Sequence, residues 1–394
     1  MRILIANKFW YARGGDCVVA MCTARLLRRM GHEVAVFTMD YPENDPDQHV
    51  AGTAPRVDFA GSWAGKWQYL RRVMGGAGVK PAFQQVLHDF DPQVVHLHNV
   101  HSYLSPVVAQ LAHEHGCRVV WTMHDYKLLC PTYSCLRNGQ PCYDCVKHPL
   151  EVVNHRCMKR SLPASIAALI EHTQWNINRL QQWVDAFICP SQFMAQKLRE
   201  ADIPEDKIAV LHNFMPSERI GNSPISIGRA HYCCYVGRLS EEKGVATLIE
   251  AAAKLPFTIK IAGDGPLGEE LHNRSAHCPN VEWLGRVDAT QVDTLLRLSR
   301  FMVMPSECWE VFSLSAVESL CAGTPVVGTR MGGIPELIDD TCGLLVPPSD
   351  PDALATAMQQ VWDARWDYAA IARHAATRFD EQQHYRALMA VYGS

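Results

Sequence analysis

The sequence predicts an α/β fold of two tandem, Rossmann-like domains, each with a doubly wound parallel sheet. Three observations predict it. Short β-branched runs alternate with amphipathic segments, a stretch without periodicity interrupts this alternation, and the alternation then begins again. The length of 394 residues suits two ordinary domains, and an apolar share of 48% is that of a globular protein.

The first alternation predicts an N-terminal domain over residues 1–214. After the first strand, apolar residues recur every three or four positions from Val19 to Met30, as on one face of a helix, and Gly31 ends that helix. The expected helix caps are Asp16, Ser102 or Ser105, and Ser191, because their short side chains can accept backbone N–H groups. The expected strands are 2–6, 33–37, 93–97, 118–123 and 186–189.

The segment 213–230 is rich in Gly, Pro and Ser and has no period, so the domain boundary is expected there. A second alternation follows and predicts a C-terminal domain over 225–370. Residues 371–394 are helical in pattern and are expected to pack back toward the N-terminal domain. The expected strands are 231–236, 257–262, 281–284, 301–304 and 325–328, and the expected helices are 245–254, 267–276, 289–298 and 315–322.

Composition and charge narrow the class of protein. Lys and Arg number 37 and Asp and Glu 41, a formal charge of -4, so no basic field favours nucleic acid as a partner. The N-terminal apolar run is too short for a signal peptide, and no apolar stretch approaches the ~18 residues of a spanning helix. We therefore expect a cytoplasmic location, with any membrane contact peripheral on the inner face of the plasma membrane.

The densest chemical signal lies where a predicted strand runs through a loop into a helix. Glu310 lies in the loop and Glu318 about one turn into the helix, so both carboxylates can face a ligand at the start of the helix. Backbone amides at the same helix start are free to bind an anion. The alternative is an ordinary helix with acidic residues near its positive end, and the spacing alone leaves both open.

With the runs 322–327 (Ala-Gly-Thr-Pro-Val-Val) and 332–336 (Gly-Gly-Ile-Pro-Glu), these glutamates resemble the signature of family-4 retaining glycosyltransferases. The resemblance implies the GT-B fold, with a cleft between two Rossmann-like domains, and sugar transfer from a nucleotide sugar with retained configuration. It also implies that Glu310 contacts sugar hydroxyls and Glu318 the ribose. Between them the donor-binding residues would be Val311, Phe312, Ser313 and Leu314, with Ser313 where the family usually has Gly.

Two cations follow the first strand of the C-terminal domain. Arg238 and Lys243 lie five residues apart between a strand and a helix, so both can converge on one diphosphate. There they would offset the charge that grows on a departing nucleotide. A solvated loop with two basic residues is the alternative. The resemblance assigns both positions to the family's phosphate-binding pair.

Glycines mark loops in which the backbone can approach a ligand closely, because glycine carries no Cβ. Gly14 and Gly15 lie between a strand and a helix, as in a loop that binds a phosphate or a sugar. The run 263–265 (Gly-Asp-Gly) is a tight turn after a strand, and a plain turn without a ligand is the alternative. The resemblance implies donor-binding backbone at Gly14, Gly15, Gly237, Gly263, Gly265 and Gly285.

Histidines follow two of the predicted strands. His124 closes the strand 118–123, where its ring could bond a sugar hydroxyl, and a structural role is the alternative for a lone histidine. The resemblance implies that His124 lies beside the reacting face of the sugar. His96, His98 and His101 form a second group, for which a structural role stays equally open.

The resemblance implies that catalysis needs no cofactor. In the family the acceptor attacks from the front face, and the leaving phosphate removes the proton of the acceptor hydroxyl. Electrostatic stabilisation then does most of the catalysis. The residues to which the resemblance assigns catalysis are Arg238, Lys243, His124 and Glu310.

Five cysteines lie within residues 130–157, inside an insertion expected over 127–160. The C-x-x-C pair in this insertion has ligand spacing, and four thiolates could hold a structural zinc ion. An iron–sulfur cluster, a redox-sensitive pair or simply reduced thiols are the alternatives. The candidate ligands are any four of Cys130, Cys135, Cys142, Cys145 and Cys157.

The expected function is transfer of a sugar from a UDP-, GDP- or ADP-linked donor to a glycan, lipid-linked or small-molecule acceptor, in bacterial cell-surface polysaccharide or glycolipid assembly. The basic run 155–160 and the amphipathic segment 162–184 could lie on an anionic membrane, and a core helix with a solvated start is the alternative. Two other functions stay open: a nucleotide-sugar epimerase of the same fold, and a non-catalytic, metal-bearing protein that binds sugars or regulates.

Overall fold

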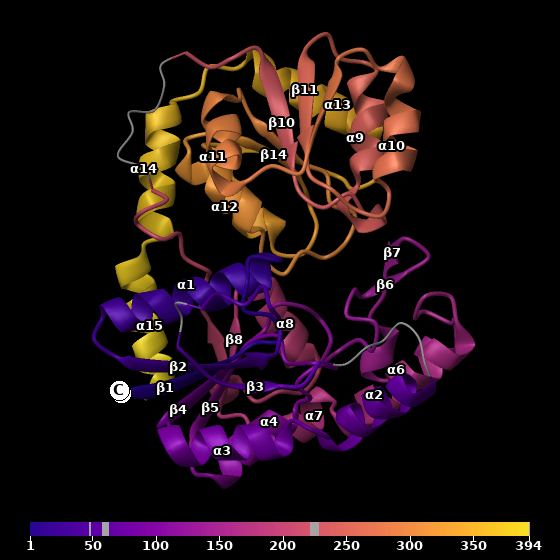
Figure 1. The fold of residues 1–394 in the computed structure, drawn as a ribbon. Helices are drawn as coiled ribbons and strands as arrows, with labels where there is room; N and C mark the ends of the chain where they lie inside the picture. The colour runs from indigo at the N-terminus through magenta and orange to yellow at the C-terminus, as the bar shows by residue number, and fades with distance from the viewer. Residues whose placement is uncertain (47–48, 57–62, 221–227, 394) are drawn as a thin grey trace. The chain divides into compact units, whose positions relative to one another are not determined.

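The computed structural model describes residues 1–46, 49–56, 63–220 and 228–393 (Figure 1). They form two compact units. The first combines Met1–Arg137, Cys142–His212 and His384–Ser394, and the second consists mainly of Asn213–Gln383. The expected domain start at 225 falls outside the described residues. Residues 371–383 belong to the second unit, so only the last part of the expected terminal segment joins the first.

Among its described residues, the first unit has a parallel sheet of seven strands in the order β3-β2-β1-β4-β5-β8-β9. The chain order runs outward in both directions from β1 and β4, which is the doubly wound topology that the sequence predicts. Of these strands, β3 and β9 were not predicted. The bounds are β1 (Arg2–Ala6), β2 (Glu33–Met39), β3 (Val50–Ala54), β4 (Val94–Leu97), β5 (Arg118–Thr122), β8 (Ala186–Cys189) and β9 (Ile208–Val210).

Helices α1 and α15 pack on one face of this sheet (Figure 1). Ile3 and Ile5 of β1 meet Ala20 and Leu27 of α1 and Leu388 of α15 in one buried cluster. The apolar positions of α1 that predict a helix are therefore the ones that bury it. The helices are α1 (Gly15–Arg29), α2 (Trp63–Gly75), α3 (Lys80–Phe90), α4 (Val107–Glu114), α6 (Leu162–Gln174), α7 (Ile177–Leu180), α8 (Gln192–Glu200) and α15 (Glu381–Tyr392).

One of the three predicted helix caps is confirmed. Neither Ser102 nor Ser105 caps α4, because Pro106 occupies that position. Ser191 caps α8, because its hydroxyl accepts a backbone N–H of the first turn at 3.2 Å. Asp16 is not the cap of α1. Gly14 occupies that position with an extended backbone, and Asp16 lies in the first turn, where its negative charge favours the positive end of the helix.

The second unit has a parallel sheet of six described strands in the order β12-β11-β10-β13-β14-β15. The strands are β10 (Tyr232–Val236), β11 (Thr258–Ala262), β12 (Val281–Gly285), β13 (Met302–Met304), β14 (Val326–Thr329) and β15 (Gly343–Val346), the last not predicted. The helices are α9 (Val245–Ala252), α10 (Gly268–Arg274), α11 (Ala289–Leu298), α12 (Leu314–Cys321), α13 (Pro351–Asp363) and α14 (Tyr368–Arg378).

Both faces of the second sheet are covered. On β10, Tyr232 and Cys234 face a cluster that includes α11, α12 and α14, whereas Cys233 and Tyr235 face a cluster that includes α9, α10 and α13. Burial on both sides explains why the central strands β10 and β13 are continuous apolar runs rather than alternating ones.

The insertion contains little regular structure. Two short strands, β6 (Leu136–Arg137) and β7 (Gln140–Pro141), pair with each other, and α5 (Glu151–Asn154) packs on α6. Across the described part of the chain, no helix combines the length and the apolar character that crossing a membrane requires.

Each sheet has one point at which the strand order reverses. In the first unit it lies between β1 and β4, and in the second between β10 and β13. Open α/β sheets bind ligands beyond the carboxyl ends of the strands at such a point. The loops after these four strands contain several of the residues that the sequence singled out, among them Gly14, Arg238 and Glu310.

Candidate functional site

An ion pair joins two loops of the second unit. Lys243 ends a short 3-10 turn after β10, and Glu310 lies in the loop after β13. Nζ of Lys243 lies 2.6 Å from Oε1 of Glu310, and the Ser306 hydroxyl donates to the same oxygen at 2.7 Å. Because β10 and β13 are neighbours at the point where the strand order reverses, this pair lies at the ligand-binding edge of the sheet.

The ion pair keeps both groups charged. Burial alone would raise the pKa of Glu310, but the Lys243 ammonium and the hydrogen bonds from Lys243 and Ser306 lower it below its ordinary value. Burial alone would lower the pKa of Lys243, and the carboxylate of Glu310 more than reverses this, so the pKa of Lys243 is raised. An ammonium beside a carboxylate suits a ligand that presents both phosphate oxygens and hydroxyl groups.

Two glycines let the backbone close tightly around this site. Gly332 has a φ of +60°, and a Cβ there would collide with the backbone of Glu310, to which the neighbouring Gly333 N–H donates at 2.7 Å. Gly263 has a φ of +150°, and a Cβ there would collide with the carbonyl oxygen of Gly237. Only glycine tolerates both a positive φ and a backbone neighbour this close. Gly332 of the run 332–336 and Gly263 of the run 263–265 are therefore required by the local structure.

The loop after β10 presents the second predicted cation. Arg238 is exposed, and its guanidinium makes no hydrogen bond or ion pair with any residue that the structure describes. Its carbonyl oxygen accepts the Tyr235 hydroxyl at 2.8 Å, which fixes the loop backbone. The two predicted cations therefore differ, because Lys243 is paired with a carboxylate and Arg238 is open to a ligand.

The remaining predicted glycines of this unit lie at the ends of neighbouring strands. Just after β10, the Gly237 N–H donates to the carbonyl oxygen of Ala262, the last residue of β11, at 3.0 Å. Just after β11, the Gly263 N–H donates to the carbonyl oxygen of Gly285, the last residue of β12, at 2.8 Å. Gly265 follows in the same turn, where a Cβ would collide with the carbonyl oxygen of a neighbouring loop. The structure thus brings Gly237, Gly263, Gly265 and Gly285 together along one edge.

The second glutamate has a partner that the sequence did not predict. Glu318 lies in α12, and its Oε1 accepts from Nη1 of Arg219 at 2.9 Å. Burial raises the pKa of Glu318, and the Arg219 guanidinium opposes this rise. Since Arg219 comes from the aperiodic segment 213–230, no pattern in the sequence points to this pair.

The segment between the two glutamates begins α12. Ser313 is its N-cap, and its hydroxyl accepts the Ala316 N–H at 3.3 Å, which gives a structural reason for serine at this position. Val311 is buried beside it, and Phe312 and Leu314 are half-buried. The N–H of Ala316 is thus satisfied, whereas those of Leu314 and Ser315 have no partner within the helix and remain suited to an anion.

In the first unit, an asparagine links two carboxylates. Nδ2 of Asn99, after β4, donates to Asp16 at 3.1 Å and to Asp125 at 3.3 Å. Burial alone would raise the pKa of Asp16, but Lys8, His124 and hydrogen bonds from Cys17 and Asn99 lower it, whereas burial does raise the pKa of Asp125. This polar cluster lies where the loops after β1, β4 and β5 converge.

His124 belongs to the same edge of the first sheet. It is half-buried, and its Nε2 lies 2.8 Å from Nδ1 of His98. Burial lowers the pKa of His124, and the two neighbouring carboxylates oppose this shift, so the ring is neutral near pH 7. The predicted Gly14 and Gly15 are exposed at the start of α1, next to Asp16 in the chain.

The five cysteines of the insertion are free thiols. Cys130, Cys135 and Cys145 are buried, and interactions with the latter two thiols lower the pKa of Cys130 well below its ordinary value. Cys142 and Cys157 are half-buried. In the described part of the chain, no group of three or more His, Cys, Asp or Glu residues is arranged to hold a metal ion. A structural zinc ion therefore stays a prediction, which elemental analysis of the purified protein tests.

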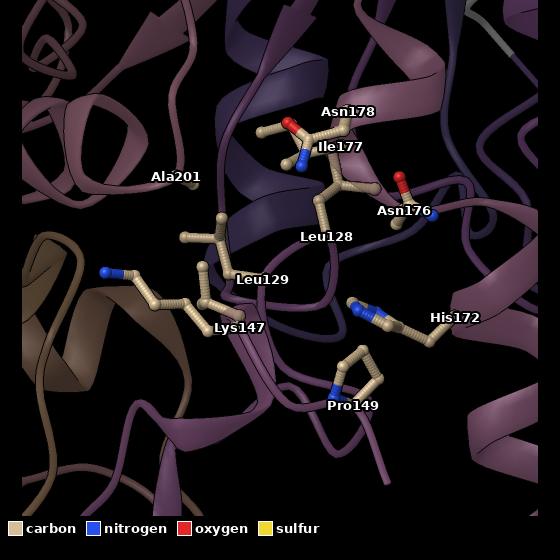
Figure 2. Close-up of a pocket in the computed structure, with 10 residues that line it drawn as sticks. Leu128, Leu129, Lys147, Pro149, His172, Asn176, Ile177, Asn178 and Ala201 are labelled. Carbon is tan, nitrogen blue, oxygen red and sulfur yellow. The ribbon is translucent and has the colours of Figure 1, made fainter.

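A separate cavity of about 240 Å³ lies in the first unit, between the insertion and α6, α7 and α8 (Figure 2). Its lining is mostly apolar, and His172 points into it from α6. None of the predicted site residues lines it. The cavity is therefore distinct from the polar cluster at the carboxyl ends of the strands.

Several polar residues of the two clusters were missed by the sequence analysis. Asn99 lies two residues after the predicted strand 93–97, so its place near a strand end was an available signal. The pairing of Asp16 with Asn99 could not be read from the sequence, because it depends on the strand order. Arg219 had no signal, because its partner lies 99 residues further along the chain.

Comparison with known proteins agrees with this architecture. A crystal structure of HepE from Anabaena in complex with UDP and glucose aligns over 100% of both chains, with a TM-score of 0.71 and 18% sequence identity. It supports the GT-B fold, with two Rossmann-like halves, that the sequence resemblance implied.

Curated relatives match part of the chain. The chain is 32% identical over 173 residues to MJ1178, an uncharacterised glycosyltransferase of Methanocaldococcus jannaschii, which is 43% of this chain and 47% of that protein. It is 34% identical over 150 residues to the D-rhamnosyltransferase WbpZ of Pseudomonas aeruginosa. The match covers 37% of this chain and 39% of WbpZ. The chain thus spans less than half the length of these two relatives.

Two family models account for both units. The model described as "Glycosyl transferases group 1" matches residues 230–364, which contain the ion pair of Lys243 and Glu310. The model described as "Glycosyltransferase Family 4" matches residues 13–219, more than half of the chain and nearly all of the first unit. The chain belongs to glycosyltransferase family 4.

Proposed function

We propose that this protein transfers a sugar from a nucleotide-sugar donor to an acceptor, with retention of the anomeric configuration. The observation that carries the proposal is the Lys243–Glu310 ion pair after β10 and β13 of the second sheet. Arg238, whose guanidinium has no partner among the described residues, lies in the adjoining loop. Two cations and a carboxylate match the parts of a nucleotide sugar, since the cations suit its diphosphate and the carboxylate its sugar hydroxyls.

The donor is a UDP-, GDP- or ADP-linked sugar in this proposal. HepE, which shares the fold, has been crystallised with UDP and glucose and with UDP-glucose, which supports a nucleotide-linked donor. The Glu318 carboxylate in α12 is available for the ribose once Arg219 moves aside. Backbone N–H groups from Val311 to Leu314, at the start of the same helix, would contact the phosphates.

The chemistry follows from electrostatics. As the bond between the sugar and the diphosphate breaks, negative charge grows on the phosphate oxygens, and Arg238 and Lys243 stabilise it. The phosphate oxygen accepts the proton of the attacking acceptor hydroxyl, so no protein base is required. In this scheme Glu310 holds the sugar through its hydroxyl groups, and His124 is the residue of the first unit that is assigned a contact with the sugar. No cofactor takes part in this scheme.

The acceptor is a glycan, a lipid-linked sugar or a small molecule, within bacterial cell-surface polysaccharide or glycolipid assembly. One similar protein supports this part: an uncharacterised protein in the cps region of Klebsiella pneumoniae, which is 24% identical over 86% of this chain and 87% of its own.

Reaction in the cytoplasm at the inner face of the plasma membrane completes the proposal. The exposed apolar side chains Leu162, Ile166 and Ile170 recur every four residues along α6 and support peripheral contact. Arg156, Lys159 and Arg160 precede them in the chain and would face anionic lipid headgroups.

The test is nucleotide release from a panel of UDP-, GDP- and ADP-sugars, with and without candidate acceptors. We expect slow hydrolysis of one donor without an acceptor and faster release with the correct one. The anomeric configuration of the product, measured by NMR, distinguishes retention from inversion. Conversion of the donor into an isomeric nucleotide sugar would instead identify an epimerase. If no donor in the panel releases its nucleotide and the protein contains a stoichiometric metal, a non-catalytic binding protein would be favoured.

A further inference from the structure

Two imidazoles of the first unit share a hydrogen bond in their common plane. Nδ1 of His98 lies 2.8 Å from Nε2 of His124, and the two ring planes differ by only 17°. His98 follows β4 and His124 follows β5, which are neighbouring strands. Because a neutral imidazole has one N–H and one lone pair, one ring must donate and the other must accept.

The surroundings of His98 decide which ring donates. Its side chain is buried at 1% exposure, and its Nε2 is buried and has no hydrogen-bond partner among the residues that the structure describes. A buried N–H without an acceptor is rarer in proteins than a buried acceptor without a donor. The proton of His98 therefore lies on Nδ1, where it has a partner, and His98 donates to His124.

The neighbouring ring of His96 does not provide a hydrogen bond to Nε2 of His98. The ring of His96 packs against His98 with centroids 4.3 Å apart and planes tilted by 34°, but both ring nitrogens of His96 are engaged. One lies 2.7 Å from the Tyr392 hydroxyl of α15 and the other 2.7 Å from the Thr122 hydroxyl of β5. The contact therefore restrains the His98 ring without offering it a second hydrogen bond.

The other side of His124 agrees with this assignment. Its Nε2 is occupied by His98, and within the described residues its Nδ1 has no hydrogen-bond partner. The carboxylates of Asp16 and Asp125 are close enough to act on the charge of the ring. Negative charge nearby favours a proton on the open nitrogen, which is Nδ1.

We propose that His98 is a positioning residue that fixes His124 as the neutral tautomer with its proton on Nδ1. His124 then offers an N–H donor at the ligand-binding edge of the first sheet, so it recognises an oxygen atom of its ligand and does not act as a base through this nitrogen. This assignment deepens the proposed function and rests on it for the identity of the ligand, which would be the donor sugar. The tautomer itself depends only on the protein.

The experiment is ¹⁵N NMR of the full-length protein labelled at histidine, near pH 7.5. Protonated and unprotonated ring nitrogens differ widely in ¹⁵N shift, and the signals are assigned by their loss in His98 and His124 variants. We expect Nδ1 to be the protonated nitrogen of both rings. A proton on Nε2 of His124 in the wild-type protein would overturn the proposal, whether or not any sugar transfer is found.

Two variants separate a positioning role from a structural one. His98→Asn places an amide N–H where Nδ1 lies, and His98→Leu keeps an apolar side chain without a donor. In His98→Leu, we expect His124 to lose its fixed tautomer and kcat to fall about tenfold or more, with little change in donor KM. In His98→Asn, we expect both the tautomer of His124 and kcat to be restored. Unchanged His124 signals in a folded His98→Leu protein would contradict the proposal. If that variant does not fold, the wild-type and Asn spectra decide.

Discussion

Lys243 and Glu310 form an ion pair across two loops that leave neighbouring strands of the second sheet, with 2.6 Å between Nζ and Oε1. Each keeps the other charged, although the side chains are only 30% and 13% exposed. Removing either charge leaves the other in a site with little water, which is costly. The pair therefore serves the folded site even before a ligand contributes its own charges.

This relationship predicts the effect of removing the ammonium. Lys243→Ala should lower kcat by about 100-fold or more, because in the proposed mechanism Lys243 stabilises charge that grows only as the nucleotide departs. Donor affinity should fall much less. Steady-state kinetics and calorimetric titration with the donor measure the two effects.

The matched control for this variant is Lys254→Ala, which removes a surface lysine paired with Asp352 and should leave both quantities unchanged. Equal losses in donor affinity and turnover for Lys243→Ala would contradict the role in stabilising the leaving group. In that case the lysine would act on the bound donor and the transition state alike.

A second prediction concerns the ion pair of Glu318 with Arg219. Both side chains are partly exposed, at 26% and 41%, so the pair is worth at most about 1 kcal/mol. If the ribose replaces the guanidinium, Arg219→Ala should tighten binding of the product nucleotide by up to about fivefold. Arg274→Ala, which removes an exposed arginine of the same unit, is the control. Weaker binding would instead mean that Arg219 itself contacts the nucleotide.

Of these two ion pairs of the second unit, one could be predicted from the sequence and the other could not, for physical reasons. Lys243 and Glu310 could be predicted as partners of one ligand, because a regular alternation puts the loops after parallel strands at one edge. The pair of Arg219 and Glu318 could not, because the segment of Arg219 has no periodicity. Strand β3 was missed because its Val50-Ala-Gly-Thr-Ala54 sequence contains little β-branched surface, and the neighbouring β2 determines its conformation.

A third prediction follows from the buried histidines, all of which lie in the first unit. Burial lowers the pKa of His96 and His101 to about 3 and that of His172 and His384 to about 4. Between these values and about 6.5, the unfolded chain binds protons that the folded chain does not. The free energy of unfolding should therefore be highest above pH 6.5 and fall toward pH 4. Each histidine contributes up to about 1.4 kcal/mol per pH unit.

Denaturant unfolding between pH 7.5 and 5, followed by circular dichroism, measures this dependence. His172→Phe removes one of the titratable imidazoles. His172 lines a cavity, so the phenylalanine ring has room there. The variant should therefore lose less stability than the wild type between pH 7.5 and 5.5. His148→Phe, which replaces an exposed histidine, serves as the control. Parallel curves for His172→Phe and the wild type would show that His172 takes up its proton in the folded state as well.

The last prediction concerns the glycine beside Glu310. Gly332 and Gly285 both have left-handed backbone, with φ of +60° and +66°, but their surroundings differ. A Cβ at Gly285 would meet nothing within 4 Å, whereas a Cβ at Gly332 would collide with the backbone of Glu310. Gly285→Ala should therefore cost only the left-handed strain of about 1 kcal/mol in the free energy of unfolding.

Gly332→Ala must pay the same strain and also displace the loop that holds Glu310, so it should lose clearly more stability than Gly285→Ala. Because Glu310 accepts from Lys243 and Ser306 through one oxygen, even a small displacement weakens both bonds. Donor binding by Gly332→Ala should weaken for that reason. Equal stability losses in the two variants would mean that the loop moves freely, and the ion pair would then owe its geometry to its own attraction rather than to the packing of the Gly-Gly turn.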